Sequence, residues 1–223
     1  NGPTDYMMEL LTSEMVKYAS NNFLATKISF INEMAELCEA YGADIENVRT
    51  GMCSDKRIGN QFLYPGLGYG GSCFPKDTLA CIAMGLEAGQ PAQLSQAVHD
   101  VNQRQRDRFF DRISAEFDGD LVGKKLAFWG LAFKPHTDDV REAPALTIAR
   151  KCIDAGATVC GYDPVAAANA KRDLAQTGHE IDLADSMYDA VQGAHALVIC
   201  TDWDEFKAPD LPKLRTALDR PIV

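Results

Sequence analysis

The stretch Lys125–Tyr162, KLAFWGLAFKPHTDDVREAPALTIARKCIDAGATVCGY, decides the fold of the second half of the chain. Its first apolar run, Lys125–Gly130, predicts a short buried strand. A helix is expected at Pro144–Ala155, because proline favours the first helical turn and Gly156 follows its end. A second apolar run, Ala157–Tyr162, predicts a second strand. Strand, helix and strand in this order predict a parallel pair joined by a right-handed crossover.

Toward the C-terminus the same alternation continues. The further expected elements are helices at Ala166–Ala175, Ser186–Val191 and Leu211–Leu218, a third strand at Ala194–Cys200, and the start of a fourth strand at Pro221–Val223. Residues 118–223 therefore predict a Rossmann-like parallel α/β domain. Ligands of such sheets bind beyond the carboxyl ends of the strands, which here means the loop Gly130–Arg141. That loop lacks G-x-G-x-x-G, so an ordinary dinucleotide site is not expected. Asp163 resembles the ribose-binding acid of such folds, but Asp163-Pro164 is equally a turn pair.

Toward the N-terminus the pattern is helical. Ser13 is expected to cap a long helix of about 40 Å that ends at Gly42. Asp44 is expected to cap a short helix, and Ala92–Phe117 predicts a second long helix. Residues 1–117 therefore predict an all-helical domain, and the whole chain an α + α/β protein.

Composition bounds the class of protein. The chain has 223 residues, of which 46% are hydrophobic and 24% charged, as in ordinary soluble domains. A net charge of −10 argues against nucleic acid or an anionic membrane as partner. Its 7 cysteines form no C-x-x-C pair, which favours a reducing, cytoplasmic setting over disulfides and indicates no metal site. No membrane span or signal peptide is predicted. The chain lacks a starting Met and ends in an apolar run, so we expect part of a longer protein.

A glycine-rich loop carries the strongest candidate for chemistry. In Gly68–Asp77, GYGGSCFPKD, Pro75 marks the first turn of a helix and Cys73 lies at its N-terminus. Unpaired backbone N–H groups, the helix dipole and Lys76 would favour a thiolate there. The glycines allow a ligand to approach the backbone closely. Cys73 is therefore a candidate nucleophile, against the alternative of a buried structural cysteine.

Three further groups of residues are candidates for binding. Lys17 and Asn21 are four residues apart and share one helix face, which could also be a plain solvated face. Arg57 and the segment Phe62–Gly66 suit a polar ligand that carries rings, although a lone arginine usually forms a surface ion pair. Lys134 and Arg141 could hold phosphate, or simply belong to a solvated loop.

Four blocks together resemble one family, the nucleotide-sugar dehydrogenases that oxidise UDP-glucose or GDP-mannose. The blocks are Lys17–Glu33, Asp55–Asp77, Gly130–Pro144 and Tyr162–Pro164. The sequence SCFPK at Ser72–Lys76 is similar to that of the UDP-glucose branch rather than the N-acetylhexosamine branch. GDP-mannose remains an alternative substrate. The resemblance implies that 1–117 is the central dimerisation domain and 118–223 the UDP-sugar-binding domain. The family's N-terminal NAD-binding domain is absent, so we expect the fragment to be inactive alone.

The resemblance also implies residue roles. Cys73 would form a thiohemiacetal and a thioester during NAD-dependent oxidation of the sugar alcohol to the acid. The residues implied in catalysis are Cys73, Lys17, Asn21 and Asp77. Those implied in substrate binding are Lys17, Asn21, Arg57, Phe62, Leu63, Tyr64, Pro65, Gly66, Gly70, Phe133 and Lys134, with Arg57 reaching the site of a dimer partner. Lys76 and Arg141 would contact NAD. A homodimer through the long central helix is implied, and a non-catalytic dimerisation and nucleotide-sugar-binding module is the alternative.

Overall fold

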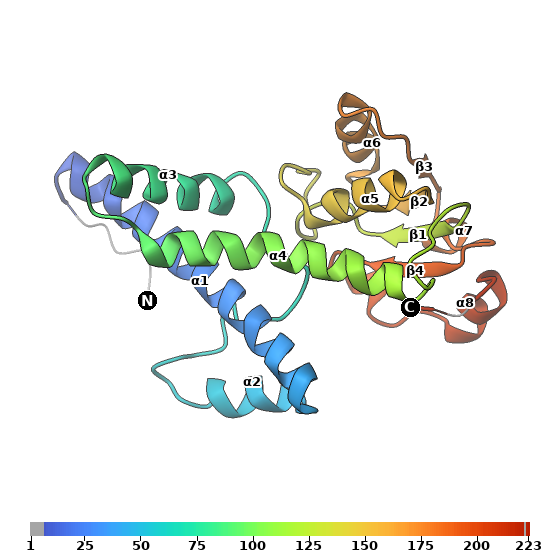
Figure 1. Ribbon diagram of the computed structural model, residues 1–223, viewed down its shortest axis with the longest axis horizontal. Helices are drawn as coiled ribbons and strands as arrows, with labels where there is room; N and C mark the ends of the chain where they lie inside the picture. The colour runs from blue at the N-terminus through green and yellow to red at the C-terminus, as the bar shows by residue number, and fades with distance from the viewer. Residues whose placement is uncertain (1–6, 221) are drawn as a thin grey trace. The chain divides into compact units, whose positions relative to one another are not determined.

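A computed structural model of the chain describes residues 7–220 and 222–223 (Figure 1). The chain divides into two compact units. The helical unit comprises the chain up to residue 66 together with residues 73–102, and the α/β unit comprises residues 67–72 together with 103–223. The glycine loop before Cys73 therefore belongs to the α/β unit, whereas Cys73 itself belongs to the helical unit.

Helices build the helical unit. They are α1 (Leu10–Tyr41), α2 (Ile45–Cys53), α3 (Phe74–Glu87) and the first part of α4 (Gln93–Ala115). The expected cap at Ser13 is wrong, because the Ser13 N–H donates to the Glu9 carbonyl at 2.9 Å and the helix begins at Leu10 with Glu9 as N-cap. The expected ending of α1 is confirmed, since Gly42 adopts the left-handed conformation at φ 72°. Asp44 caps α2 as expected, through its side chain and the Glu46 N–H.

A parallel sheet forms the centre of the α/β unit. Its strands are β1 (Lys125–Trp129), β2 (Thr158–Tyr162), β3 (Asp182–Leu183) and β4 (Ala196–Ile199), which the described residues arrange in the order β3-β2-β1-β4. The other elements are α5 (Pro144–Asp154), α6 (Ala167–Gln176), α7 (Met187–Ala190), the 3₁₀ turn η1 (Asp204–Phe206) and α8 (Leu211–Ala217). The predicted α/β fold is therefore confirmed.

Two details of the sheet differ from expectation. The two-residue strand β3 was not predicted, because it is too short to show a period. The fourth strand was instead expected at Pro221–Val223. Pro221 lies outside the described residues, and Ile222 and Val223 are not in a strand, although the Leu197 N–H donates to the Ile222 carbonyl at 2.9 Å.

Successive side chains of β1 point to opposite faces of the sheet, and each face carries a hydrophobic core. Leu126 and Phe128 pack into one cluster with α5 and α6, while Ala127 and Trp129 pack into a second cluster with α7 and α8. A sheet covered on both faces needs strands that are apolar on both sides, and β1 is buried along nearly its whole length. No helix in the described part of the chain combines the length and apolar character that a membrane crossing requires.

Candidate active site

Cys73 is the N-cap of α3 and is exposed. Pro75 occupies the first turn as expected, and the Asp77 N–H donates to the Cys73 carbonyl at 2.9 Å. The sulfur therefore lies at the end of a helix where backbone N–H groups lack helical partners. This is a position that suits a reactive cysteine.

Asp77, one turn after Cys73, is fully buried and collects three polar partners. Asn21 donates to Asp77 Oδ2 at 2.5 Å, and the ammonium of Lys17 lies 3.8 Å from the same oxygen. On the other side, the Lys76 ammonium lies 3.3 Å from Asp77 Oδ1. The structure thus brings Lys17 and Asn21, which precede Asp77 by 60 and 56 residues in sequence, into one network with it at the start of α3.

Asn22 is a residue of this network that the sequence prediction did not include. Its amide nitrogen lies 2.9 Å from the Tyr18 carbonyl, 3.2 Å from the Asp77 carbonyl and 3.0 Å from Cys81 Sγ. Burial raises the pKa of the Cys81 thiol, an effect that Asn22 opposes and the charge of Asp77 reinforces. Asn22 therefore joins α1 to α3 beside Asp77. The unfavourable Asn21-Asn22 pair in mid-helix was the signal for it.

The segment from Phe62 to Gly66 is fixed by a buried amide. Asn32 of α1 is 1% exposed, and its Oδ1 accepts the Gly66 N–H at 2.8 Å. Leu63 is 2% exposed, so its side chain is not available to a ligand. Pro65 is half-buried.

Aromatic side chains flank this segment. Phe62 has a φ of 63°, and its ring packs edge-on against Phe74 with centroids 6.0 Å apart. Tyr64 is exposed and lies beneath the Arg49 guanidinium, 5.1 Å from the ring centroid.

Arg57 lies apart from the Asp77 network. Its side chain is 89% exposed and forms a fork with Asp55, with Nη2 2.6 Å from Oδ2. The pKa of Asp55 is lowered by this hydrogen bond. The described residues of the helical unit do not bring Arg57 to Asp77, so its role stays a prediction.

In the α/β unit the candidate residues follow β1. Because β2 and β4 flank β1 on opposite sides, the chain reverses direction across the sheet between β1 and β4, where ligands of such sheets bind. Phe133 is half-buried, and the exposed Lys134 places its ammonium 5.3 Å from the Phe133 ring centroid. Arg141 forms a fork with Asp139, and these hydrogen bonds hold the pKa of Asp139 below its usual value.

Asp163 organises the start of this loop. Its Oδ2 accepts the N–H groups of Leu131 at 2.8 Å and Ala132 at 3.2 Å. Its Oδ1 accepts those of Val165 at 2.9 Å and Ala166 at 2.7 Å. The side chain is buried and both oxygens are occupied, so the likeness of Asp163 to a ribose-binding acid is misleading. With no glycine fingerprint either, the α/β unit does not fit NAD in the manner of a Rossmann dinucleotide site.

The glycine loop packs tightly on the α/β unit. The Gly71 N–H donates to the Arg141 carbonyl at 2.8 Å. A Cβ at Gly70 would overlap the Glu142 carbonyl, and one at Gly71 would lie 2.8 Å from the Phe133 ring. These glycines are required because no side chain fits between the loop and its neighbours.

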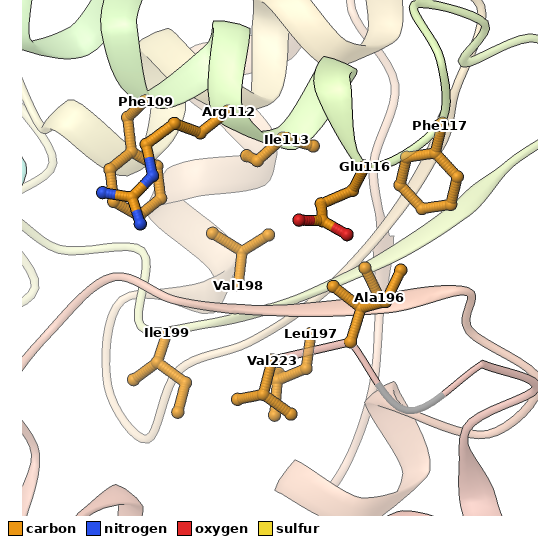
Figure 2. Close-up of a pocket in the computed structure, with 11 residues that line it drawn as sticks. Phe109, Arg112, Ile113, Glu116, Phe117, Ala196, Leu197, Val198, Ile199 and Val223 are labelled. Atoms are coloured by element: carbon orange, nitrogen blue, oxygen red, sulfur yellow. The ribbon is translucent and has the colours of Figure 1, made fainter.

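An apolar pocket of about 290 Å³ opens elsewhere in the α/β unit (Figure 2). Side chains of α4 and β4 line it, among them Phe109, Ile113 and Val198, together with the carboxylate of Glu116. None of the residues predicted for function lines this pocket.

Two segments of the chain match models of known protein families. Residues 11–104 match the central domain of the UDP-glucose/GDP-mannose dehydrogenase family, and residues 127–223 match the UDP binding domain of that family. A UDP-glucose 6-dehydrogenase of Pseudomonas aeruginosa is 48% identical over 213 residues, which is 95% of this chain and 47% of the relative. One of Rhizobium meliloti is 44% identical over 212 residues, which is 95% of this chain and 48% of the relative.

Solved structures of dehydrogenases also resemble this chain. A UDP-glucose dehydrogenase from Pyrobaculum islandicum matches with a TM-score of 0.85 and 36% identity, over 97% of this chain and 51% of that one. A GDP-mannose dehydrogenase from Pseudomonas aeruginosa matches with a TM-score of 0.59 and 25% identity, over 89% of this chain and 48% of that one. The chain spans about half the length of the relatives it matches. With both segments matched, this chain belongs to the UDP-glucose/GDP-mannose dehydrogenase family.

Proposed function

We propose that this chain is the part of a UDP-glucose 6-dehydrogenase that holds the nucleophile and binds the UDP-sugar. The enzyme would oxidise UDP-glucose to UDP-glucuronate in two NAD-dependent steps. The observation that carries the proposal is the exposed Cys73 at the N-terminus of α3, one turn before the buried Asp77 network. The similarity to curated UDP-glucose 6-dehydrogenases supports the choice of substrate.

The chain's own residues would act on C6 of the sugar. After the alcohol has become an aldehyde, the Cys73 thiolate adds to it, and the new C–S bond leaves an oxyanion of a thiohemiacetal. The Lys17 ammonium and the Asn21 side-chain amide would stabilise that oxyanion. Loss of a hydride then gives a thioester. Water attacks the thioester, the C–S bond breaks, and Asp77 would orient the water or take its proton.

Two residues would contact the cofactor. When bound, NAD would accept the hydride in each of the two oxidations. Lys76 and Arg141 are exposed cations, 65% and 68% accessible, that could meet its phosphates. Since the α/β unit does not fit a dinucleotide, no adenosine site is assigned to it.

Binding of the UDP-sugar would use the loop after β1. Lys134 offers its ammonium to phosphate and Phe133 its ring, while Gly70 and the Phe62–Gly66 segment would contribute backbone groups. Arg57 would reach the site of a partner subunit.

Nucleotide choice is expected to separate the proposal from its GDP-mannose alternative. In calorimetric titrations of the 223-residue chain, we expect UDP-glucose to bind and GDP-mannose to bind at least about tenfold more weakly. Lys134→Ala is expected to weaken UDP-glucose binding about tenfold or more, the loss typical of a hydrogen bond to a charged group.

The matched control is Lys171→Ala, since Lys171 is an exposed lysine on α6 of the same unit. Its binding of UDP-glucose should equal that of the unaltered chain. Equal or tighter binding of GDP-mannose would refute UDP-glucose as substrate.

We also propose that the protein forms a homodimer through α1. Four exposed apolar side chains recur at seven-residue intervals on this helix: Val16, Phe23, Phe30 and Leu37, which are 50%, 64%, 43% and 48% accessible. A seven-residue apolar repeat is typical of helices that pair along a seam. The seam would extend about 32 Å. We propose a cytoplasmic location as well, because the seven cysteines form no disulfide among the described residues.

Charges on this seam are expected to break the dimer. In sedimentation velocity at micromolar concentration, the unaltered chain should sediment as a dimer and Phe23→Asp/Phe30→Asp as a monomer, because buried carboxylates without partners are costly. Val122→Asp is the control, since Val122 is an exposed apolar residue of the α/β unit, and it should remain dimeric. A dimeric double variant would rule out the α1 seam.

A further inference from the structure

Arg106 of α4 is a buried cation that reaches two loops of the α/β unit. Its side chain is 3% exposed. Nη2 donates to the Tyr69 carbonyl at 3.0 Å and to the Glu142 carbonyl at 3.2 Å. Nη1 lies 3.4 Å from the Thr147 hydroxyl and 3.5 Å from the Glu142 carboxylate. One guanidinium thus bonds to the glycine loop, to the turn after Arg141 and to the first part of α5.

Burying the Arg106 guanidinium costs desolvation free energy. Desolvation lowers the pKa of Arg106, which the Glu142 carboxylate partly offsets. That carboxylate is 58% exposed, and Arg106 Nε has no partner among the described residues. An apolar side chain of similar size would fill the space without this cost. What an apolar residue could not supply is the pair of donors to the Tyr69 and Glu142 carbonyls.

The two loops that Arg106 joins also touch directly. The Gly71 N–H donates to the Arg141 carbonyl at 2.8 Å, and Gly70 packs on the Glu142 carbonyl. Glu142 has a φ of 51°, a left-handed conformation that a non-glycine residue adopts only when its surroundings hold it. Gly71 in turn packs on the Phe133 ring. The position of the glycine loop therefore shapes the surface beside Phe133 and Lys134.

We infer that Arg106 is a positioning residue for the nucleotide-sugar site: it locks the glycine loop, residues 67–72, onto residues 139–142 and so shapes the surface around Phe133. The ligand part of this inference rests on the proposed function, whereas the loop part does not. Arg106 touches neither the proposed reacting atoms nor the proposed ligand groups, and its hold on the two loops runs through the carbonyls of Tyr69 and Glu142.

Two variants of the full chain, Arg106→Met and Arg106→Lys, test the inference with two readouts. Hydrogen exchange should be at least about tenfold faster at residues 69–71 in Arg106→Met, with β1 amides unchanged, because the carbonyl anchors are lost. Calorimetry should show UDP binding weakened about tenfold. In Arg106→Lys, both the exchange rate and the UDP affinity should lie between those of the unaltered chain and Arg106→Met, because an ammonium is a point donor without the planar fork. It also provides the test if Arg106→Met does not fold.

Arg150→Met is the matched control. Arg150 pairs with Asp173 and Thr177, on the side of α5 that faces α6, and its loss should change neither loop exchange nor UDP affinity.

Each outcome decides a separate point. Faster loop exchange together with weaker UDP binding supports the inference. Unchanged exchange at residues 69–71 overturns it, whether or not UDP binds. Faster exchange with unchanged UDP affinity overturns the positioning role and leaves Arg106 merely structural, provided Lys134→Ala weakens binding. If the unaltered chain does not bind UDP, the proposed function and the ligand part fall, and loop exchange alone decides the anchoring.

Discussion

Cys73→Ser is expected to lower the formation of UDP-glucuronate by at least about a thousandfold, measured on the full gene product with UDP-glucose and NAD. A serine hydroxyl is a much weaker acid than a thiol and stays protonated near neutral pH, so it would not form the covalent intermediate at a useful rate. Binding of UDP-glucose should persist within about threefold, because the substitution changes one atom. The loss would therefore fall on kcat rather than on KM.

A matched cysteine separates this effect from general damage. Cys53 is a half-buried cysteine at the end of α2 in the same helical unit. Cys53→Ser should keep the rate of the unaltered enzyme within about threefold. Full turnover to the acid by Cys73→Ser would show that the thioester pathway is wrong.

The largest effect on stability is expected at Asp163. Asp163→Ala removes a buried carboxylate that accepts four backbone N–H groups, and all four would be left without this acceptor. We expect the free energy of unfolding of the α/β unit to fall by about 3–5 kcal/mol, a large share of the stability of a typical domain. Asp163→Asn should have a free energy of unfolding between those of the unaltered chain and Asp163→Ala. Its amide oxygen would still accept two N–H groups, whereas its NH₂ group would face the other two donors.

Tryptophan fluorescence reports on this unit alone. Both tryptophans of the chain, Trp129 and Trp203, lie in the α/β unit and are buried. Urea titrations followed by this signal give the free energy of unfolding. Asp204→Ala is the control, because Asp204 is an 84% exposed carboxylate paired with Lys207, and its midpoint should not change. An unchanged midpoint for Asp163→Ala would contradict the structural role.

Local chemistry made much of the fold predictable. Gly130 follows the apolar run that became β1, Pro144 begins α5, and Gly156 separates α5 from the run that became β2. The backbone preferences of these three residues are strong. Cys73 could be placed at a helix start from Pro75 alone. Ser13 failed because Leu10 and Leu11 extend the helix by another turn, and a cap residue is only one of several ways to begin a helix.

Partners distant in sequence made the rest unpredictable. Asp163 is typical of a turn by sequence, and only the fold brings it to Leu131, 32 residues away. Arg106 belongs to a stretch rich in arginine that favours a solvated face, yet its guanidinium is buried and donates to the carbonyl of Tyr69, 37 residues away. Asn22 and Asn32 lie in the middle of α1, where asparagine is unfavourable. The low helix propensity marks them as unusual but does not say which groups they bond to. Burial and hydrogen bonding of such groups depend on tertiary contacts that a local pattern does not contain.

Mass spectrometry of the Cys73 peptide tests the central claim most directly. The full gene product would be mixed with UDP-glucose and NAD, quenched in acid during turnover, and digested. We predict that a fraction of the peptide containing Cys73 carries the mass of a UDP-glucuronyl thioester, that hydroxylamine removes it, and that no other cysteine peptide carries it. Rapid turnover to the acid that proceeds equally well in Cys73→Ser, with no adduct on this peptide in the unaltered enzyme, would contradict the account.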